Sequence, residues 1–223
     1  MKYRNEWKHE INFLDKLTLE QTLRAVCSPD PNAKDGIYEI RSIYFDDIKD
    51  TALKEKINGV NKREKFRIRL YNGDSSLILL EKKSKEKGMT SKEQVKLSYV
   101  EAKLISEGSY EWMKDSDKNL VLELYSKMQS KGLRPKTIVD YTREPFVYGP
   151  GNVRITIDYN IRTGLHCTDF LIPDCITVPV PDFPIILEVK WDEYLPDVIR
   201  HAVQLRGRHT SAFSKYAACR AYG

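Results

Sequence analysis

The segment with the clearest chemical potential is a short run in which basic and apolar side chains alternate. It reads Arg63-Glu-Lys-Phe-Arg-Ile-Arg-Leu-Tyr71. In a β-strand alternate side chains share a face, so Lys65, Arg67 and Arg69 point one way and the apolar residues between them point the other. Guanidinium groups bind phosphate oxygens in pairs, and lysine adds a point charge. The segment could therefore bind an anion, although an ordinary half-buried strand would send the same charges to water.

The same alternation recurs elsewhere in the chain, which argues against the ordinary interpretation. Charged or polar side chains share one face in several further segments. These sets are Glu6 and Lys8; Glu81 and Lys83; Tyr141 and Arg143; Arg154, Thr156 and Asp158; and Glu188 and Lys190. In the last two segments the opposite face is entirely apolar. Because helices need an apolar surface to pack on, helices that cover those faces would turn the charged faces inward.

An enclosed space lined by so many cations is expected to be unstable when empty. Like charges at short range in a partly desolvated space repel by roughly several kcal/mol in total. Water, a divalent metal and a polyanion would relieve that repulsion, and carboxylates of matching orientation could hold the metal. The pattern therefore predicts a clamp for a chain of phosphates.

The elements that must position these residues are mostly strands. Alternating segments lie at 3–11, 37–46, 65–71, 77–84, 90–97, 136–148, 152–161 and 184–192. Tyr148-Gly-Pro-Gly151 is typical of a tight turn between two of them. Many antiparallel strands with a few helices favour a barrel or a strongly curved sheet. We expect one domain over residues 1–223, mainly antiparallel β (α+β), in which eight strands close into a tunnel barrel with peripheral helices.

Helices are predicted to interrupt the strands at five places. Capping signatures predict helix starts at Thr18 with Gln21, at Ser98 with Glu101, and at Asp117. The third helix is expected to stop near Gly132, because glycine readily adopts the left-handed conformation of a C-cap. The last two helices are expected near 195–205 and 211–221.

Composition places the chain in a broad class. It has 223 residues, of which 41% are hydrophobic and 31% charged, with a formal net charge of +5. The positive excess favours anionic partners without choosing among nucleic acid, membrane and phosphate. The four cysteines form no Cys-x-x-Cys pair, and the charged first residues do not resemble a signal peptide. No apolar run is long enough to cross a bilayer, so a cytoplasmic protein with reduced thiols is expected.

The order of short motifs along nearly the whole chain resembles the catalytic domain of the vacuolar transporter chaperone (VTC) family. Those proteins are polyphosphate polymerases within the triphosphate tunnel metalloenzymes. The motifs are Glu6-Trp-Lys8, Ser42-Ile-Tyr-Phe-Asp46, Arg63-Glu-Lys-Phe-Arg-Ile-Arg69, Leu80-Glu-Lys-Lys83, Tyr141-Thr-Arg143, Val153-Arg-Ile-Thr-Ile-Asp158, Leu187-Glu-Val-Lys190 and Phe213-Ser-Lys-Tyr216. The resemblance implies transfer of the γ-phosphate of ATP to a growing polyphosphate chain inside a basic tunnel.

The resemblance also implies roles for individual residues. Catalytic phosphate-binding positions are Lys8, Arg67, Arg69, Lys83, Arg143, Arg154 and Lys215; further substrate-binding positions are Lys92, Tyr141, Lys190 and Ser214; the metal-holding carboxylate is Glu188. The metal would be manganese or magnesium. Eukaryotic members sit in membrane complexes that export the product, so a membrane partner is compatible with this chain.

One departure from the wider superfamily separates the alternatives. Hydrolytic members often open with Glu-x-Glu-x-Lys, whereas here Arg4 stands in place of the first carboxylate of Arg4-Asn-Glu6-Trp-Lys8. Fewer carboxylates give weaker support for a second metal and for activating water. Polymerisation is thus favoured over an inorganic triphosphatase or nucleoside-triphosphate hydrolase. A non-catalytic polyphosphate-binding module is a further alternative, and nucleic-acid binding ranks last because no basic-aromatic motif is present.

Overall fold

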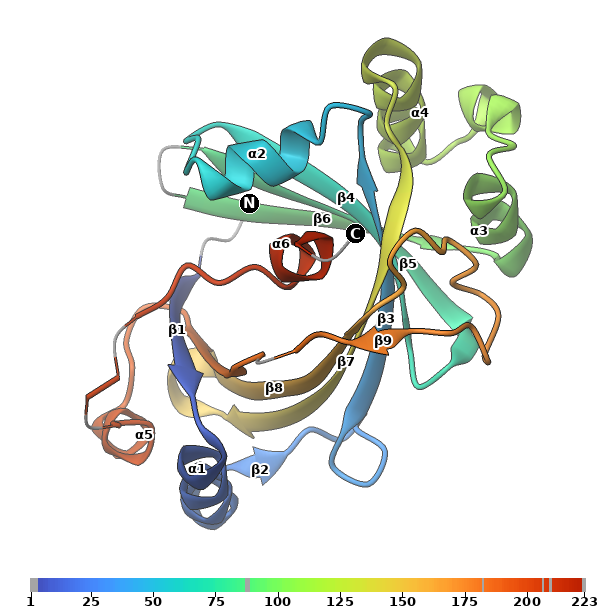
Figure 1. Ribbon diagram of the computed structural model, residues 1–223. Helices are drawn as coiled ribbons and strands as arrows, with labels where there is room; N and C mark the ends of the chain where they lie inside the picture. The colour runs from blue at the N-terminus through green and yellow to red at the C-terminus, as the bar shows by residue number, and fades with distance from the viewer. Residues whose placement is uncertain (1–3, 87–88, 182, 206, 209, 222–223) are drawn as a thin grey trace.

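The computed structural model describes residues 4–86, 89–181, 183–205, 207–208 and 210–221. Its centre is one strongly curved antiparallel sheet (Figure 1). Its eight main strands follow the order β1-β10-β8-β7-β3-β4-β5-β6. Their bounds are β1 Asn5–Ile11, β3 Tyr38–Asp46, β4 Arg63–Tyr71, β5 Asp74–Glu86, β6 Met89–Leu97, β7 Arg134–Tyr148, β8 Val153–Thr163 and β10 Ile185–Trp191. Two short strands, β2 (Ser28–Pro29) and β9 (Val178–Pro179), pair with β7 and β8. All eight predicted strands are confirmed, with ends that differ by a few residues.

The prediction that the barrel closes is wrong. Among the described residues no strand pairing joins β1 to β6, so the sheet curls into an open half-barrel. The outer edge of β1 is already occupied, because His9 pairs with Thr210 and the Ser211 amide donates to the Lys8 carbonyl at 2.8 Å. The Ser211 hydroxyl also donates to Glu10 at 2.6 Å. Backbone groups satisfied in this way cannot form a ladder with another strand.

Helices cover the convex face of the sheet, as the apolar faces of the strands predict. Near β8 and β10 the buried cluster includes Leu23 of α1 (Phe13–Val26) and Ile199 of α5 (Asp197–Ala202). Near β4 and β5 it includes residues of α3 (Tyr99–Ser106), η1 (Glu111–Asp115) and α4 (Asn119–Lys131). Since apolar side chains at alternate strand positions pack against these helices, the charged positions between them face the concave side.

Two of the predicted helix starts are wrong, and the third is confirmed. Helix α1 begins earlier than predicted, because Asn12 rather than Thr18 forms the capping box, with Asp15 as its partner. The Thr18 hydroxyl instead donates to the carbonyl of Leu14 inside the helix, at 3.0 Å. Helix α3 has the predicted box, in which Ser98 and Glu101 cap each other.

The start of α4 is not capped by Asp117, since Lys118 occupies the N-cap position without a side-chain hydrogen bond. The helix does end at Gly132, which adopts the predicted left-handed conformation with φ of 69°. Of the two remaining predictions, α5 lies within 195–205 and α6 (Lys215–Arg220) within 211–221. The helix α2 (Thr51–Ile57) was not predicted from the sequence.

The C-terminal helix α6 lies on the concave side of the sheet, within the curve (Figure 1). Tyr216 and Cys219 are buried there in a cluster with Tyr44, Tyr141 and other residues of β3, β7 and β8. The rings of Tyr216 and Tyr44 stack with centroids 5.1 Å apart. An apolar filling therefore occupies part of the lumen, and the polar residues are confined to the remainder.

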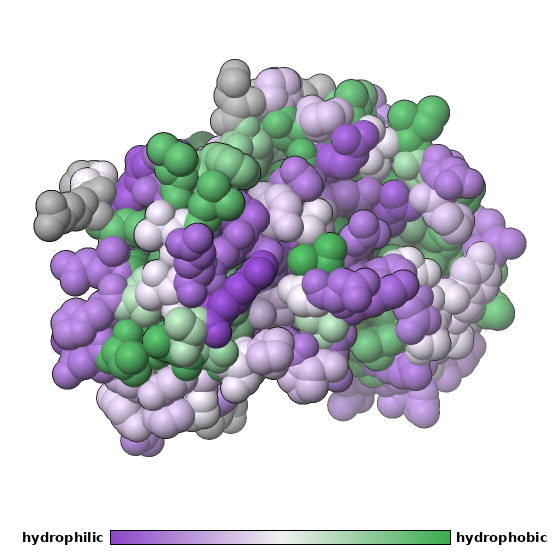
Figure 2. Space-filling model, turned by 90° about the horizontal axis from the view of Figure 1, so that it is seen from below, coloured by the Kyte–Doolittle hydropathy of each residue, from purple (hydrophilic) through white to green (hydrophobic). Residues whose placement is uncertain are grey.

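The outer surface is mixed in polarity. On the face seen from below, hydrophilic and hydrophobic side chains are interspersed (Figure 2). Helix α1 illustrates the two environments, because Leu19 and Leu23 are buried whereas Phe13 and Leu14 are exposed. Exposed apolar side chains are ordinary on protein surfaces.

The predicted turn between β7 and β8 is present, and its second glycine is under tight constraint. Gly151 has φ of +72°, and a Cβ added there would lie 2.5 Å from the Tyr194 carbonyl oxygen. Replacing Gly151 by alanine is expected to destabilise the fold by about 1–3 kcal/mol, through backbone strain and overpacking. Gly149→Ala is the matched control, because Gly149 has φ of −59° and open space around a Cβ. Thermal denaturation of the two variants measures the difference, and equal Tm values would contradict the prediction.

Candidate functional site

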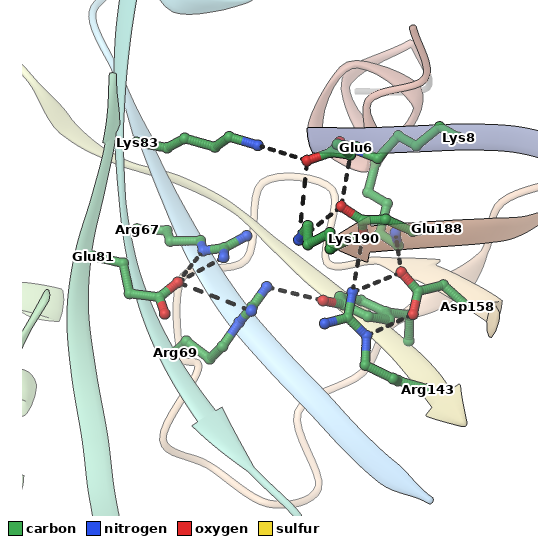
Figure 3. Close-up of polar contacts among 12 residues, drawn as sticks. Glu6, Lys8, Arg67, Arg69, Glu81, Lys83, Arg143, Asp158, Glu188 and Lys190 are labelled. Carbon is green, nitrogen blue, oxygen red and sulfur yellow. Dashed lines mark hydrogen bonds and ion pairs between the residues drawn. The ribbon is translucent and has the colours of Figure 1, made fainter. Parts of the chain in front are cut away.

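One wall of the concave site is built by β4, β5 and β6 around a single buried carboxylate. Glu81 accepts a hydrogen bond from Arg67 Nε at 2.6 Å and lies 3.9 Å from Arg69 Nη1 (Figure 3). Lys92 of β6 forms an ion pair with the same carboxylate. Burial opposes ionisation of Glu81, but Arg67, Arg69 and Lys92 outweigh it and hold its pKa below its usual range. The wall is thus a carboxylate surrounded by three cations.

The facing wall comes from β1 and β10, where the antiparallel register places Lys8 opposite Glu188. Glu188 lies 2.8 Å from Lys190 Nζ, 3.5 Å from Lys8 Nζ and 3.8 Å from an Arg143 nitrogen. Burial alone would raise the pKa of Glu188, but the cations hold it well below its usual range. Glu188 is therefore ionised throughout the physiological range.

Between the walls, Asp158 of β8 organises a third group of charges. Arg143 donates two hydrogen bonds to its carboxylate, at 2.6 and 2.8 Å, and Lys215 donates one at 2.6 Å. The side chain of Asp158 is fully buried. Burial would raise its pKa, yet Arg143 and Lys215 lower it to about 2. A bidentate pair of this kind holds the Arg143 guanidinium in one orientation.

Two contacts join the walls into one site. Arg69 donates to the Tyr141 hydroxyl at 2.9 Å, which connects β4 to β7 (Figure 3). Across the open seam, Lys83 of β5 lies 3.9 Å from Glu6 of β1. Glu6 also pairs with Lys8 at 2.6 Å. Polar side chains thus bridge the gap that backbone hydrogen bonds leave open.

The structure brings most of the predicted site residues together. The residues that lie in this network are Lys8, Arg67, Arg69, Lys83, Lys92, Tyr141, Arg143, Glu188, Lys190 and Lys215. Two predicted residues lie apart from it. Arg154 is 42% exposed and pairs with Asp30 at 3.2 Å, and Ser214 is the N-cap of α6, where its Oγ accepts from the Ala217 amide at 3.4 Å. The phosphate-binding roles of all these residues remain predictions.

The expectation of strong repulsion in an empty tunnel needs correction. Each of the nine lysines and arginines predicted to bind phosphate has a carboxylate within 4.0 Å, so positive and negative charges alternate in space. These nine predicted cations are Lys8, Arg67, Arg69, Lys83, Lys92, Arg143, Arg154, Lys190 and Lys215. The carboxylates that serve them are Glu6, Glu81, Asp158, Glu188 and Asp30. Strand alternation had already placed Glu6, Glu81 and Asp158 on the faces of the cations, but it assigned them no role. Asp30 lies in a loop, so no pattern pointed to it.

Tyr44 of β3 is a further site residue, to which no role was assigned from the sequence. Its hydroxyl accepts a hydrogen bond from Arg67 Nη1 at 2.8 Å, and its ring is 97% buried against Tyr216. Burial opposes ionisation of the phenol, but Arg67, Lys65 and Arg69 outweigh it and lower its pKa to about 7. The alternation of β3 places Tyr44 on the same face as Ser42, two residues earlier, and this was the pattern that could have pointed to it.

The carboxylates fit a divalent ion that takes most of its ligands from phosphate and water. Glu188 and Glu6 share Lys8 and Lys190 as partners, so two carboxylates converge on one region. Over the part of the chain that the structure describes, no group of three or more His, Cys, Asp or Glu could hold a metal alone. Magnesium commonly binds through one or two carboxylates plus substrate phosphates. Glu188, the predicted ligand, is suited to that mode of binding.

The chain is similar to several solved structures at low sequence identity. The chain resembles a "putative adenylate cyclase" from Bacillus halodurans with a TM-score of 0.52 and 14% identity, over 85% of this chain and 80% of that one. It also resembles the PH1819 protein of Pyrococcus horikoshii OT3, with a TM-score of 0.45 and 15% identity, over 90% and 84% of the two chains. No curated protein matches the chain significantly. Within the described residues no helix is long and apolar enough to span a membrane.

The curved antiparallel sheet with peripheral helices is the predicted fold class, apart from its closure, and its concave face carries charged residues of both signs. The sequence profile of the VTC domain matches residues 3–222. The chain therefore belongs to the VTC domain family, which confirms the resemblance seen in the motifs.

Proposed function

We propose that this protein is a polyphosphate polymerase, which transfers the γ-phosphate of ATP to the end of a polyphosphate chain. The observation that carries the proposal is the convergence of Arg67, Arg69, Arg143, Lys8 and Lys215 on one enclosed region. Such a cluster matches a polyanion whose charges would join the internal carboxylates as partners of the cations. ATP and magnesium are abundant in the cytoplasm, where we place the protein.

The reaction needs positioning and charge neutralisation more than a protein nucleophile. A terminal oxygen of the acceptor chain attacks the γ-phosphorus, and the bond from that phosphorus to the β,γ-bridging oxygen breaks as ADP leaves. Arg67 and Arg69 on one wall and Arg143 on the other would hold the phosphates between them. The Arg143 guanidinium is held in one orientation by Asp158, so little reorganisation accompanies binding. A divalent ion held by Glu188 would neutralise phosphate oxygens when bound.

Hydrolysis is the second candidate, and the surroundings of Arg4 weigh against it. The Arg4 guanidinium forms an ion pair with Asp192 at 2.9 Å and a hydrogen bond to the Asn152 carbonyl. It therefore fastens the start of β1 to the turn before β8. The carboxylate that hydrolytic relatives carry at this position is missing, and with it a ligand that would support activation of water.

Incubation with ATP and manganese or magnesium tests the proposal. Long phosphate polymers resolved on a gel, with ADP formed in proportion, would support polymerisation. Release of free orthophosphate alone would identify a hydrolase instead. Tight binding of polyphosphate without any turnover of ATP would leave only a binding module.

A further inference from the structure

Lys65 lies at one end of the site and belongs to none of the three groups of cations that surround Glu81, Glu188 and Asp158. It is on β4, and alternation places it on the same face as Arg67 and Arg69. It lines a cavity of about 250 Å³ together with Lys8, Lys56, Arg63, Lys83 and Lys85. Thr90, Thr210 and Ser211 line the same cavity. The cavity thus forms a mouth that opens from the network of paired charges.

Lys65 differs from the nine predicted cations in its partners. Within the described residues no carboxylate lies within 4.0 Å of its Nζ, whereas each of the nine has at least one. The cavity does contain two acidic residues, but both are engaged elsewhere. Glu6 pairs with Lys8, Lys83 and Lys190, while Glu64 pairs with lysines of β5 and α4.

The groups that face Lys65 are cations and one phenol. They are Tyr44 from β3, Arg67 from β4, Lys83 from β5 and Lys8 from β1. The Lys65 Nζ lies 5.6 Å from the centroid of the Tyr44 ring. An ammonium group in these surroundings loses hydration and is repelled by the three cations, and only the negative charge of an ionised Tyr44 opposes that repulsion. Burial, supported by the nearby cations, accordingly lowers the pKa of Lys65 to about 7.

We propose that Lys65 is a phosphate-binding residue of the mouth, whose positive charge is stabilised when an anion lies beside it. An anion would supply the negative charge that no carboxylate provides beside Lys65, so its binding is accompanied by uptake of a proton at Lys65. The same anion disfavours the phenolate of Tyr44, which adds a second site of uptake. This inference rests on the proposed binding of phosphate chains, but it does not require catalysis.

The direction of the pH dependence follows from the same surroundings. In the empty protein Lys65 loses its proton as the pH rises through about 7, whereas in the complex it keeps the proton to higher pH. Affinity for tripolyphosphate should therefore fall as the pH rises above about 7, by up to tenfold per pH unit for each proton taken up. Arginine at this position cannot lose its proton in this range, so Lys65→Arg should flatten the profile.

Isothermal titration calorimetry with tripolyphosphate tests the proposal directly. Titrations near neutral pH in buffers of different ionisation enthalpy give the number of protons taken up on binding. Lys65→Met should bind more weakly and take up fewer protons than the wild type, and Lys65→Arg should bind well with reduced uptake. Tyr44→Phe removes the phenol and isolates the contribution of the lysine. Lys103→Met, on the exposed surface of α3, is the control for loss of one positive charge.

Three outcomes separate this inference from the proposed function. Equal affinity and equal proton uptake in Lys65→Met and the wild type would overturn the role of Lys65, even if ATP is polymerised. Reduced uptake in Lys65→Met with no polymerisation by the wild type would support the role of Lys65 and refute the polymerase. Failure of the wild type to bind tripolyphosphate would overturn both.

Discussion

Replacing Glu188 by glutamine is expected to lower metal-dependent turnover of ATP by at least about 10²-fold, while binding of polyphosphate is retained or strengthened. Glutamine keeps the shape of the side chain but removes the charge that a divalent ion needs. It also frees Lys8 and Lys190, which both pair with Glu188, to interact with phosphate. Turnover and binding should therefore change in opposite directions.

Two independent measurements check this expectation. Product formation is followed with saturating manganese, and tripolyphosphate affinity is measured by calorimetry without metal. Glu107→Gln, at the C-cap of α3, makes the same chemical change at an exposed position outside the site, so it serves as the matched control. Unchanged turnover in Glu188→Gln would remove this residue from the list of metal ligands.

Replacing Asp158 by asparagine is expected to destabilise the empty protein by about 3–5 kcal/mol, the usual cost of removing one partner from a buried ion pair. Asp158 is fully buried between Arg143 and Lys215 and accepts hydrogen bonds from both. Asparagine retains the shape but removes the charge that neutralises both cations, so that Arg143 keeps only Glu188, 3.8 Å away. For a chain of this size each kcal/mol lowers Tm by about 2–4 °C.

Ligand rescue distinguishes repulsion from simple loss of packing. Tripolyphosphate should raise the Tm of Asp158→Asn more than that of the wild type, because the anion supplies the missing negative charge. At about 100 times its Kd a ligand stabilises the folded state by about 2.7 kcal/mol. Asp117→Asn, at an exposed position, controls for the substitution itself. Equal effects of tripolyphosphate on the two proteins would contradict the electrostatic explanation.

A second variant keeps the test informative if Asp158→Asn does not fold. Adding Arg143→Gln removes one of the two cations that would repel each other. The double variant should then regain part of the lost stability, since the remaining Lys215 no longer faces a like charge. A double variant less stable than Asp158→Asn would show that Arg143 stabilises the fold by packing instead.

Local side-chain patterns in the sequence determined which residues face the site. Alternation along β4, β7, β8 and β10 fixes which side chains share a face, because successive strand residues point to opposite sides of the sheet. The apolar positions between the charges required a cover of helices, and α1, α3, α4 and α5 provide it on the convex face. Thus Arg67, Arg69, Arg143 and Glu188 could be assigned to the concave face before any coordinates were known.

The partners of those residues were decided by tertiary structure. Which carboxylate neutralises which cation depends on the curvature of the sheet and on contacts between strands far apart in the chain, as between Lys83 and Glu6. The open seam arose in the same way, because the segment at Thr210 and Ser211 occupies the edge of β1. The absence of a carboxylate beside Lys65 was also decided by the tertiary structure. Its own strand pattern is identical to that of Arg67, and only the arrangement of the other strands leaves it among cations.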